Sequence, residues 1–371
     1  MRLKNSLLLY PILGITLLSC IQDEKPNSEA DIETCTVVSP EGIVNDLLIE
    51  NNRNPKILIY VNKGSDVTQM KLDFTLTPGA TIEPVNGTIR DFTTPKQYTV
   101  TSEDRQWQKT YIVEVSTDII NIPTEFHFEN TELVDDKFEV FYELLPSGTK
   151  LFIWASGNGG YAIIAADKKP YEYPTTLYDD GKSGKCAKLE TLSTGKLGSL
   201  ASMPIAAGNL FIGRFETKNA MFKPLEATLF GGNFNFMPTT LTGYYQYKAG
   251  DVFTEKDGKV NPDMKDNFDI YAIIYETDSN FPYLDGTDQL TSPRLISVAR
   301  IKDSDKKNTS QWTSFNIPFE LKQGKNIDKE KLANGGYKIS IVFSSSIYGD
   351  QFRGAVGSTL LIDEVKLITE K

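Results

Sequence analysis

The sequence predicts an all-β protein with two β-sandwich domains in succession. Short runs of Val, Ile, Thr, Tyr and Phe recur along the chain and alternate with polar residues, as half-buried strands do. Turn signals such as Pro78-Gly79 and Asn86-Gly87 separate these runs, and no long segment has helical periodicity. The 371 residues are more than a single hydrophobic core usually serves, so we expect two domains.

The chain begins with the pattern of a lipoprotein signal peptide. Arg2 and Lys4 precede an apolar run over residues 7–18, which is shorter than the roughly 20 residues that a membrane-spanning helix needs. Cys20 follows a small residue and lies where a lipoprotein signal peptidase would cleave and acylate the chain. We therefore predict a signal peptide over residues 1–19 and lipidation of Cys20. An ordinary secretion signal with a chance cysteine is the alternative.

Residues 20–38 are polar, and we predict that they form a flexible tether between the lipid and the first domain. The cluster Gln22-Asp23-Glu24 resembles the surface-export signal of Bacteroidetes lipoproteins, which implies an outer-membrane location that faces the cell surface. The formal net charge of −10 makes nucleic acid and anionic membrane surfaces poor partners. The lipid is then the only membrane contact that we expect.

The first domain is predicted over residues 39–118. Alternating runs between Ile57 and Val115 have the turn spacing of a β-sandwich of about 80 residues. The stretch from Gly79 to Pro84 and the hairpin at residues 103–105 resemble the immunoglobulin-like N-terminal modules of Bacteroides surface lipoproteins. This resemblance implies that the domain is a spacer.

The second domain is predicted over residues 124–371, after a linker at residues 119–123. About a dozen candidate strands are too many for one open sheet, so we predict two stacked sheets of the jelly-roll type. One or two helical turns are expected over residues 327–332. The candidate strands are residues 126–128, 150–154, 161–165, 186–192, 210–215, 227–230, 241–247, 268–275, 295–301, 313–319, 337–343 and 358–368.

Several motifs of the second domain resemble the putative carbohydrate metabolism domain of Bacteroidetes lipoproteins. The resemblance implies a galactose-binding-like jelly roll, an immunoglobulin-like domain before it and a glycan-related role. It supplies no catalytic mechanism. The motifs are Phe126-His127-Phe128-Glu129-Asn130, Trp154 to Gly160, Leu241 to Tyr245, Ser292-Pro293 with Ala299-Arg300-Ile301, Ser344 to Asp350, and Gly357 to Val365.

Sugar binding requires aromatic faces for the apolar side of a pyranose, with amide, carboxylate and guanidinium groups for its hydroxyls. The segment from Ser344 to Arg353 is the most site-like part of the chain. The glycine-rich residues 157–160 match only the loosest dinucleotide fingerprint, which we reject because a further strand and no helix is expected over residues 161–165. The predicted ligand-binding residues are Trp154, Asn158, Tyr161, Arg214, Tyr244, Tyr348, Asp350 and Arg353.

Catalysis is constrained because the chain contains one histidine. His127 lies in an alternating strand beside the linker, where a structural role is favoured over that of a base, so a Ser-His-Asp or Cys-His mechanism is disfavoured. A glycoside hydrolase would need only two carboxylates on either side of a sugar. The candidates for that alternative are Glu190, Glu216, Asp269 and Glu276.

Metal and cysteine chemistry give few signals. Glu129 on the first strand and Asp363 on the last are predicted ligands of a structural calcium ion, with two surface carboxylates as the alternative. Cys35 and Cys186 have no zinc-site spacing, and whether they pair is left open by the sequence. We expect no other cofactor.

These observations favour a lipid-anchored cell-surface protein that binds glycan and takes part in polysaccharide capture or utilisation. We expect binding rather than catalysis, with glycan and other surface polysaccharide-utilisation proteins as partners. A glycoside hydrolase that uses two carboxylates and a structural or adhesin component remain the alternatives.

Overall fold

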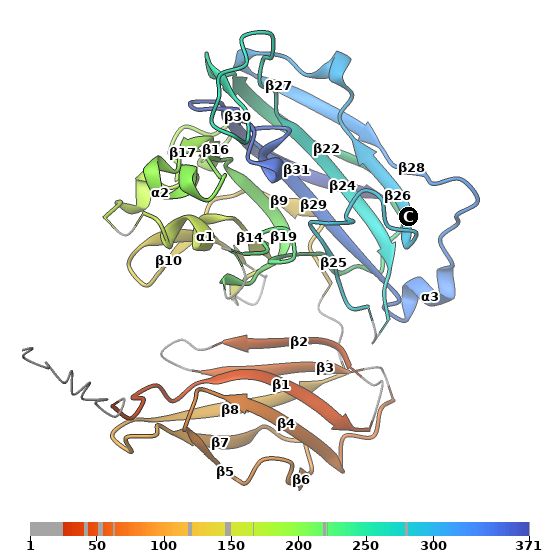
Figure 1. Cartoon of the computed structure of the whole chain (residues 1–371). Helices are drawn as coiled ribbons and strands as arrows, with labels where there is room; N and C mark the ends of the chain where they lie inside the picture. Colours follow the sequence, from red (N-terminus) through yellow and green to blue (C-terminus); the bar gives the residue numbers. More distant parts are fainter. Residues whose placement is uncertain are drawn as a thin grey trace, which may run out of the picture.

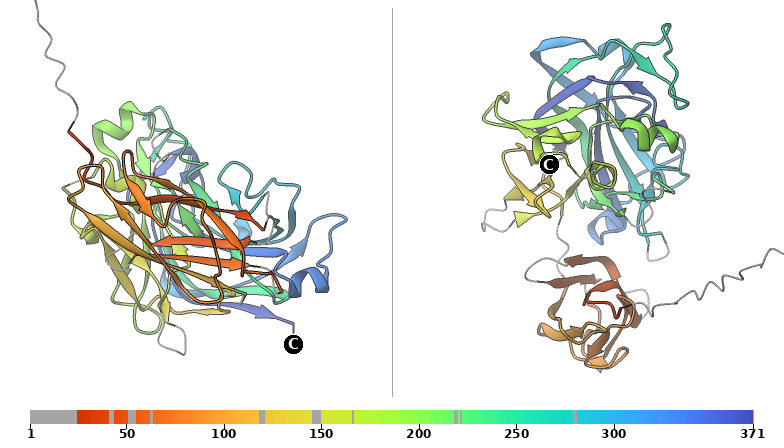
Figure 2. Two further views of the ribbon diagram at one scale, coloured as in Figure 1. Left: turned by 90° about the horizontal axis from the view of Figure 1, so that it is seen from below. Right: turned by 60° about the vertical axis from the view of Figure 1, so that its left-hand side comes forward.

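The computed structural model describes residues 25–40, 44–50, 55–61, 64–117, 121–144, 150–165, 167–217, 220, 222–278 and 281–370. These residues form two β domains, a smaller one that contains β1 to β8 and a larger one that contains β9 to β31 (Figure 1). The right-hand view of Figure 2 shows the same separation of a smaller N-terminal and a larger C-terminal domain. The prediction of an all-β chain with two sandwiches is confirmed. The predicted signal peptide, Cys20 and the acidic cluster at residues 22–24 lie outside the described residues.

The N-terminal domain packs two sheets on one core. Alternate residues of its strands, such as Ile57, Ile59 and Val61, are fully buried between the sheets. The first sheet contains, in order, β1 (Ile32–Ser39), β4 (Met70–Leu76) and β6 (Ile89–Arg90). The second contains β2 (Val44–Glu50), β3 (Lys56–Val61), β8 (Gln108–Ser116), β7 (Lys96–Thr101) and β5 (Thr81–Glu83), with β3 parallel to β8.

The first strand begins within the segment that the sequence predicts to be a tether and ends one residue beyond it. β1 pairs with β4, and both Ala30 and Ile32 are buried in the core. The backbone N–H of Ile32 donates to the hydroxyl of Tyr111 at 3.1 Å. The predicted tether boundary at residue 38 is therefore wrong, because apolar side chains spaced among polar ones were sufficient to bury one face of the strand.

The C-terminal domain stacks a larger sheet on a smaller one (Figure 1). The larger sheet runs β25 (Leu284–Asp285), β20 (Thr228–Phe230), β19 (Asn209–Phe215), β29 (Tyr337–Ser344), β24 (Asp269–Glu276), β26 (Leu295–Arg300), β28 (Glu320–Leu321), and β14 (Trp154–Ala155) and β21 (Gly232–Asn233) also pair with it. The smaller sheet runs β15 (Thr175–Tyr178), β16 (Cys186–Glu190), β31 (Thr359–Thr369), β22 (Pro238–Lys248), β27 (Thr309–Pro318), with β9 (Glu125–Phe126) against β31.

Short ribbons and helices complete this domain. The ribbons are β10 (Thr131–Val134) with β11 (Phe138–Phe141), β12 (Glu143–Leu144) with β13 (Lys150–Leu151), β17 (Leu192–Ser193) with β18 (Ile205–Ala206), and β23 (Phe253–Thr254) with β30 (Gly354–Ala355). The helices are α1 (Asn158–Ala162), α2 (Gly195–Leu200) and α3 (Lys329–Ala333), and the 3-10 turns are η1 (Pro170–Glu172), η3 (Asp303–Asp305) and η4 (Gly349–Gln351).

The larger sheet is covered on both faces. In β19, Leu210 and Ile212 point into the core between the sheets, whereas Phe211 belongs to a second apolar cluster on the opposite face. β29 repeats this alternation, with Ile341 in the core and Val342 in the second cluster. Successive side chains of a strand point to opposite faces of the sheet, so every second residue points away from the core between the sheets and toward the second apolar cluster. We call the face that bears Phe211 the outer face of the larger sheet.

The helices differ in part from the prediction. α3 lies where one or two helical turns were expected, and Asp328 caps it by accepting a hydrogen bond from the backbone N–H of Lys331 at 2.9 Å. The expected strand over residues 161–165 is wrong, because α1 begins at Asn158 and includes Tyr161. The backbone N–H of Tyr161 donates to the carbonyl of Gly157 at 3.0 Å, so the glycine-rich segment turns into a helix of five residues.

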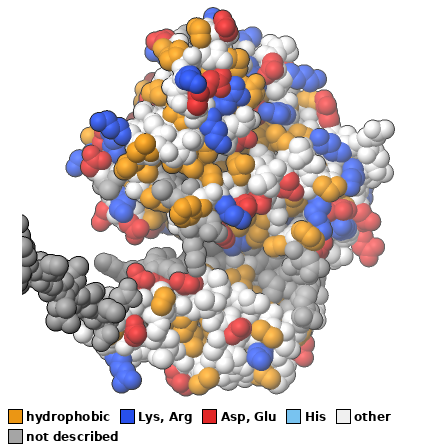
Figure 3. Space-filling model, in the orientation of Figure 1, with side chains coloured by type: hydrophobic (Ala, Val, Ile, Leu, Met, Phe, Trp, Pro, Cys, Tyr) orange, Lys and Arg blue, Asp and Glu red, His pale blue; other side chains and the backbone are white. Residues whose placement is uncertain are grey.

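The described surface carries charges of both signs, and the described helices are short. Acidic and basic side chains are interspersed over the face seen in Figure 3, without one extended basic surface. None of the helices in the described ranges is long and apolar enough to cross a membrane. Cys35 and Cys186 are free thiols that lie in different domains.

Candidate functional site

A cavity of about 420 Å³ lies against the outer face of the larger sheet. Its floor consists of outward-facing strand residues, and segments around α1, α2, β18 and η4 surround it. The volume lies within the range of roughly 300–1,000 Å³ that is typical of small-molecule sites. The floor residues are Phe211 of β19, Val342 and Ser344 of β29, Asp269 and Tyr271 of β24, and Arg300 of β26.

An ion pair forms one end of the cavity. The guanidinium of Arg300 donates from Nη2 to Oδ2 of Asp269 at 2.7 Å and from Nε to the same oxygen at 3.0 Å. The Lys306 ammonium, on a side chain that is 1% exposed, lies 3.8 Å from Oδ1 of Asp269 and 2.8 Å from Asp303. Asp269 is thus held by two cations, while the Arg300 side chain remains 41% exposed.

Asp350 of η4 supplies a second carboxylate to the cavity. Although Asp350 is exposed, the protein atoms around its carboxylate reduce its hydration and raise its pKa above the ordinary value, and repulsion from Asp269 adds to this effect. Backbone N–H groups and the Arg300 guanidinium oppose the rise in pKa. Gly349 fixes the position of the turn, because a Cβ at this residue would lie 2.4 Å from the Cβ of Ala207.

A buried hydrogen-bond network supports the segment that carries Asp350. Oδ2 of Asp266 accepts from the hydroxyls of Ser346 and Ser358 at 2.5 and 2.7 Å and from the backbone N–H of Ala355 at 2.7 Å. Burial raises the pKa of Asp266, and these hydrogen bonds oppose that rise. The Thr191 hydroxyl bonds with Ser346 at 2.6 Å. These contacts tie both ends of the η4 segment to the sandwich.

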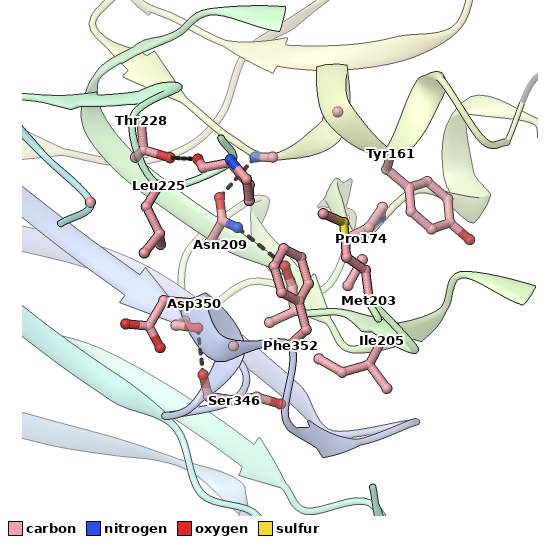
Figure 4. Close-up of a pocket in the computed structure, with 18 of the residues that line it drawn as sticks. Tyr161, Pro174, Met203, Ile205, Asn209, Leu225, Thr228, Ser346, Asp350 and Phe352 are labelled. Atoms are coloured by element: carbon pink, nitrogen blue, oxygen red, sulfur yellow. Dashed lines mark hydrogen bonds between the residues drawn. The ribbon is translucent and has the colours of Figure 1, made fainter. Parts of the chain in front are cut away.

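The other end of the cavity is apolar. Figure 4 shows Asp350 and Leu225 on one side of the cavity and Tyr161, Met203 and Ile205 on the other. The Tyr161 hydroxyl donates to the backbone carbonyl of Ser193 at 3.2 Å, so its polar atom already has a partner. Further apolar lining residues are Ile163, Ile164, Leu197, Ala201, Phe215 and Leu290.

The structure brings two of the predicted ligand-binding residues, Tyr161 and Asp350, into this cavity. Trp154 instead lies in the core at 3% exposure, where it contacts aromatic rings and donates from Nε1 to Glu143 at 2.9 Å. No face of its ring is free for a sugar. Asn158 is fully buried and bonds with both backbone polar groups of Thr175, which is a structural role.

The other predicted ligand-binding residues lie away from the cavity lining. Arg214 donates to the backbone carbonyl of Leu47 in the N-terminal domain. Tyr244 lies on β22 of the smaller sheet, below the ammonium of Lys182. The remaining two, Tyr348 and Arg353, contact each other, with the Arg353 guanidinium 4.9 Å from the Tyr348 ring centroid. Arg353 also donates to Glu255 at 2.5 Å.

The candidate catalytic carboxylates are dispersed in the same way. Asp269 is the one of the four that lines the cavity. Glu190 pairs with Lys188 at 2.6 Å, and Glu276, at the other end of β24, pairs with Lys331 at 3.0 Å. Glu216 is exposed directly after β19. The second carboxylate of the cavity is therefore Asp350, which the sequence indicated only as a ligand-binding residue.

The predicted calcium ligands Glu129 and Asp363 both contact the turn at residues 181–185. However, the backbone N–H of Ser183 donates to Asp363 at 3.0 Å, and that of Lys185 donates to both oxygens of Glu129 at 3.2 Å. A calcium ion requires several oxygen ligands, whereas N–H groups face these carboxylates. Within the described ranges no three His, Cys, Asp or Glu side chains are grouped to hold a metal. The arrangement does not fit calcium.

His127 has the structural environment that the sequence favoured. Its Nδ1 lies 2.9 Å from Oε1 of Glu364 on β31. This hydrogen bond raises the pKa of His127 above its ordinary value, although partial burial opposes the rise. The residue is not part of the cavity lining.

Sequence reasoning missed Arg300 and Tyr271 as floor residues of the cavity. A weak signal exists, since Asp269 and Tyr271 alternate with buried apolar residues in β24, and Arg300 ends the apolar strand β26. In the sheet Tyr271 pairs directly with Arg300. The apolar residues Leu197 and Met203 gave no signal, because their role depends on where α2 folds back.

Comparisons with known proteins agree with this architecture. A family model described as "Putative carbohydrate metabolism domain" matches residues 127–368, and one described as "SGBP, N-terminal" matches residues 42–115. No curated protein matches the chain. The chain is similar to a solved structure from Bacteroides thetaiotaomicron that is called a putative glycoside hydrolase, with 50% identity over 94% of this chain and 99% of that chain and a TM-score of 0.80.

A solved structure from Bacteroides vulgatus with the same description is 44% identical over 67% of this chain and 99% of that chain, with a TM-score of 0.63. The family match and the first structure together cover both sandwiches and the cavity. The chain belongs to the family described as the putative carbohydrate metabolism domain.

Proposed function

We propose that the C-terminal domain binds glycan in the cavity on the outer face of the larger sheet. The observation that carries this proposal is the convergence of Asp269, Arg300 and Asp350 at one end of a cavity that also contains Tyr161. Carboxylate and guanidinium groups hydrogen-bond sugar hydroxyls, and ring and aliphatic walls cover the apolar faces of a pyranose. Membership in a carbohydrate-related family supports the same role.

The rest of the chain is proposed to present this site at the cell surface. Lipidation of Cys20 would anchor the protein in the outer membrane, and the N-terminal sandwich would act as a spacer in polysaccharide capture. The signal pattern at residues 1–24 and the N-terminal family match support this part of the proposal. Other surface polysaccharide-utilisation proteins are the expected partners.

Binding of polysaccharides, measured on a glycan array and then by calorimetry, tests the proposed site. Replacing Asp350 by Asn or Arg300 by Gln should weaken binding by about 5- to 150-fold, since each removes a polar anchor worth about 1–3 kcal/mol. Arg353→Gln is the matched control, because Arg353 lies on the same segment as Asp350 but pairs with Glu255 outside the cavity. Equal affinity of the Asp350 and Arg300 variants and the unmodified protein would contradict the site.

Glycoside hydrolysis is a second candidate, favoured by one specific observation. Two carboxylates line the same cavity, and the raised pKa of Asp350 suits a general acid. Asp350 can donate a proton only in its protonated form, so activity would be lost as the pH rises through its pKa. Release of new reducing ends that Asp350→Asn abolishes would establish hydrolysis, whereas binding without release would establish a capture protein.

A further inference from the structure

We propose that the ligand of this cavity is amphiphilic, namely a sugar that carries an apolar substituent such as an O-acyl chain or an alkyl or aryl group. The sugar half rests on the proposed function and lies at the Asp269–Arg300–Asp350 end. The apolar substituent lies against α1, α2 and β18. This assignment follows from the chemistry of the two ends of the cavity.

The apolar end has the wrong chemistry for a bare sugar. Ile163, Ile164 and Leu197 offer no hydrogen-bond partners, and neither do Met203 and Ile205. Tyr161, the aromatic residue labelled at this end in Figure 4, is only 6% exposed, packs against Tyr173 and already uses its hydroxyl in a hydrogen bond, so it offers little free ring face to a pyranose. Sugar hydroxyls placed here would lose their water and gain no partner, which is unfavourable. An alkyl, acyl or aryl group placed here loses only unfavourable contact with water.

Exposure at the rim indicates that part of this apolar surface has no cover among the residues that the structure describes. Two of the lining residues, Ile163 and Leu197, are 47% and 66% exposed to solvent. Large apolar side chains that gather around a cavity mark a binding surface more often than isolated ones do. A substituent that enters the cavity would cover both side chains.

The apolar wall is also held in a fixed shape. The backbone N–H of Met203 donates to the carbonyl of Gly198 at 2.8 Å, and the Thr194 hydroxyl donates to the carbonyl of Met203. Gly198 permits this close return of the chain, because a Cβ there would lie 2.8 Å from the carbonyl oxygen of Met203. The segment from Thr194 to Met203 therefore forms a defined wall.

The two ends are separated in space. In Figure 4 the Asp350 carboxyl lies on one side of Phe352, and Met203, Ile205 and Tyr161 lie on the other. The charged groups thus collect at the Asp350 end of the cavity, which also contains Leu225, whereas the opposite end has no charged group among its described lining residues. A ligand that fills both ends needs the same division.

Alkyl glycosides test this inference with the full-length mature chain. We would measure by calorimetry the binding of methyl and n-octyl β-D-glucoside, the same pair of β-D-galactosides, and n-octanol, all below the concentrations at which micelles form. The octyl glycosides should bind at least tenfold more tightly than the methyl glycosides, because each buried methylene contributes about fourfold. Octanol alone should bind at least tenfold more weakly than the octyl glycosides.

A pair of variants on one helix supplies the matched control. Leu197→Asn should reduce the ratio of octyl to methyl affinity several-fold, since Leu197 lines the cavity. Leu200→Asn should leave that ratio unchanged, because Leu200 is 85% exposed on the same helix and is not among the lining residues.

Each outcome is decisive. Equal affinity for the methyl and octyl forms, or a ratio that Leu197→Asn does not change, would overturn the inference and leave the proposed glycan binding intact. Octanol that binds as tightly as the octyl glycosides would assign the cavity to a plain lipid and also overturn it. Failure of all these probes would overturn the amphiphilic ligand, while the polysaccharide array decides the proposed function separately.

Discussion

Replacing Asp363 by Asn should make the stability of the C-terminal domain less dependent on pH. Asp363 is fully buried on β31, and its carboxyl accepts backbone N–H bonds from Ser183 at 3.0 Å and Glu364 at 2.7 Å. Burial raises the pKa of Asp363 to about 6, and the nearby Glu364 carboxylate adds to the rise. The protonated carboxyl is therefore favoured in the folded domain.

The sign and size of the effect follow from this shift. The folded pKa lies above the unfolded one, so the contribution of Asp363 to stability is full below pH 4 and is lost as the pH rises through about 6. A rise from 3.8 to about 6 corresponds to about 3 kcal/mol at pH 8. Asn at this position stays neutral at every pH. The free energy of unfolding of the variant minus that of the unmodified chain should therefore increase by up to about 3 kcal/mol from pH 4 to pH 8.

Tryptophan fluorescence provides the assay. The chain has three tryptophans, of which Trp107 is 63% exposed in the N-terminal domain. A Trp107→Phe background leaves Trp154 and Trp312 as reporters of the C-terminal domain, and urea unfolding at several pH values then gives its free energy of unfolding.

A difference in the free energy of unfolding between the two proteins that stays constant from pH 4 to pH 8 would contradict the argument that burial raises the pKa of Asp363. Calcium gives an independent control at the same place. Addition of calcium, or its removal with a chelator, should leave the unfolding midpoint of the unmodified chain unchanged, because N–H groups face Glu129 and Asp363. A large calcium-dependent stabilisation at pH 8 that Asp363→Asn abolishes would show that the carboxylates bind the ion.

Three further changes test other parts of the molecule. Trp154→Ala should destabilise the C-terminal domain by about 3–5 kcal/mol in urea unfolding, because the ring is 3% exposed in the core; unchanged stability with lost glycan affinity would instead favour a stacking role. Gly349→Ala should weaken glycan binding in calorimetry by displacing the Asp350 turn from Ala207, with a small change in the melting temperature as the control. Cys20→Ala should release the protein from membranes on cell fractionation, and an unchanged membrane fraction would refute lipidation at this residue.

The fold class could be predicted from the sequence because alternation and turn signals act locally. The boundary at the first strand could not, since Ile32 is buried by β4 and by Tyr111 of the other sheet, and both lie more than thirty residues away in the sequence. α1 was mistaken for a strand because its short apolar run from Tyr161 is compatible with either structure. The contacts of Asn158 with Thr175, which hold the helix in place, are long-range contacts.

The cavity could be predicted only in part for a related reason. β24 is apolar at most positions and buried at nearly every one, so only the polar groups of Asp269 and Tyr271 indicate weakly which of its residues face the cavity. The Trp154 ring is of the type on which a sugar can stack, but its orientation depends on the pairing of β14 with β19. Asp350 was found because a polar loop after an apolar strand is a local signal.

Because both faces of the larger sheet are covered, changes in its strands and changes in the walls of the cavity affect folding differently. The floor of the cavity alternates with core residues on the same strands, so a change of backbone there disturbs the sandwich as well. The walls, by contrast, are short turns and helices that contribute little to the core between the sheets. Exchange of the α2 segment should therefore change the lining of the cavity at a smaller cost to folding than a change in the strands of its floor.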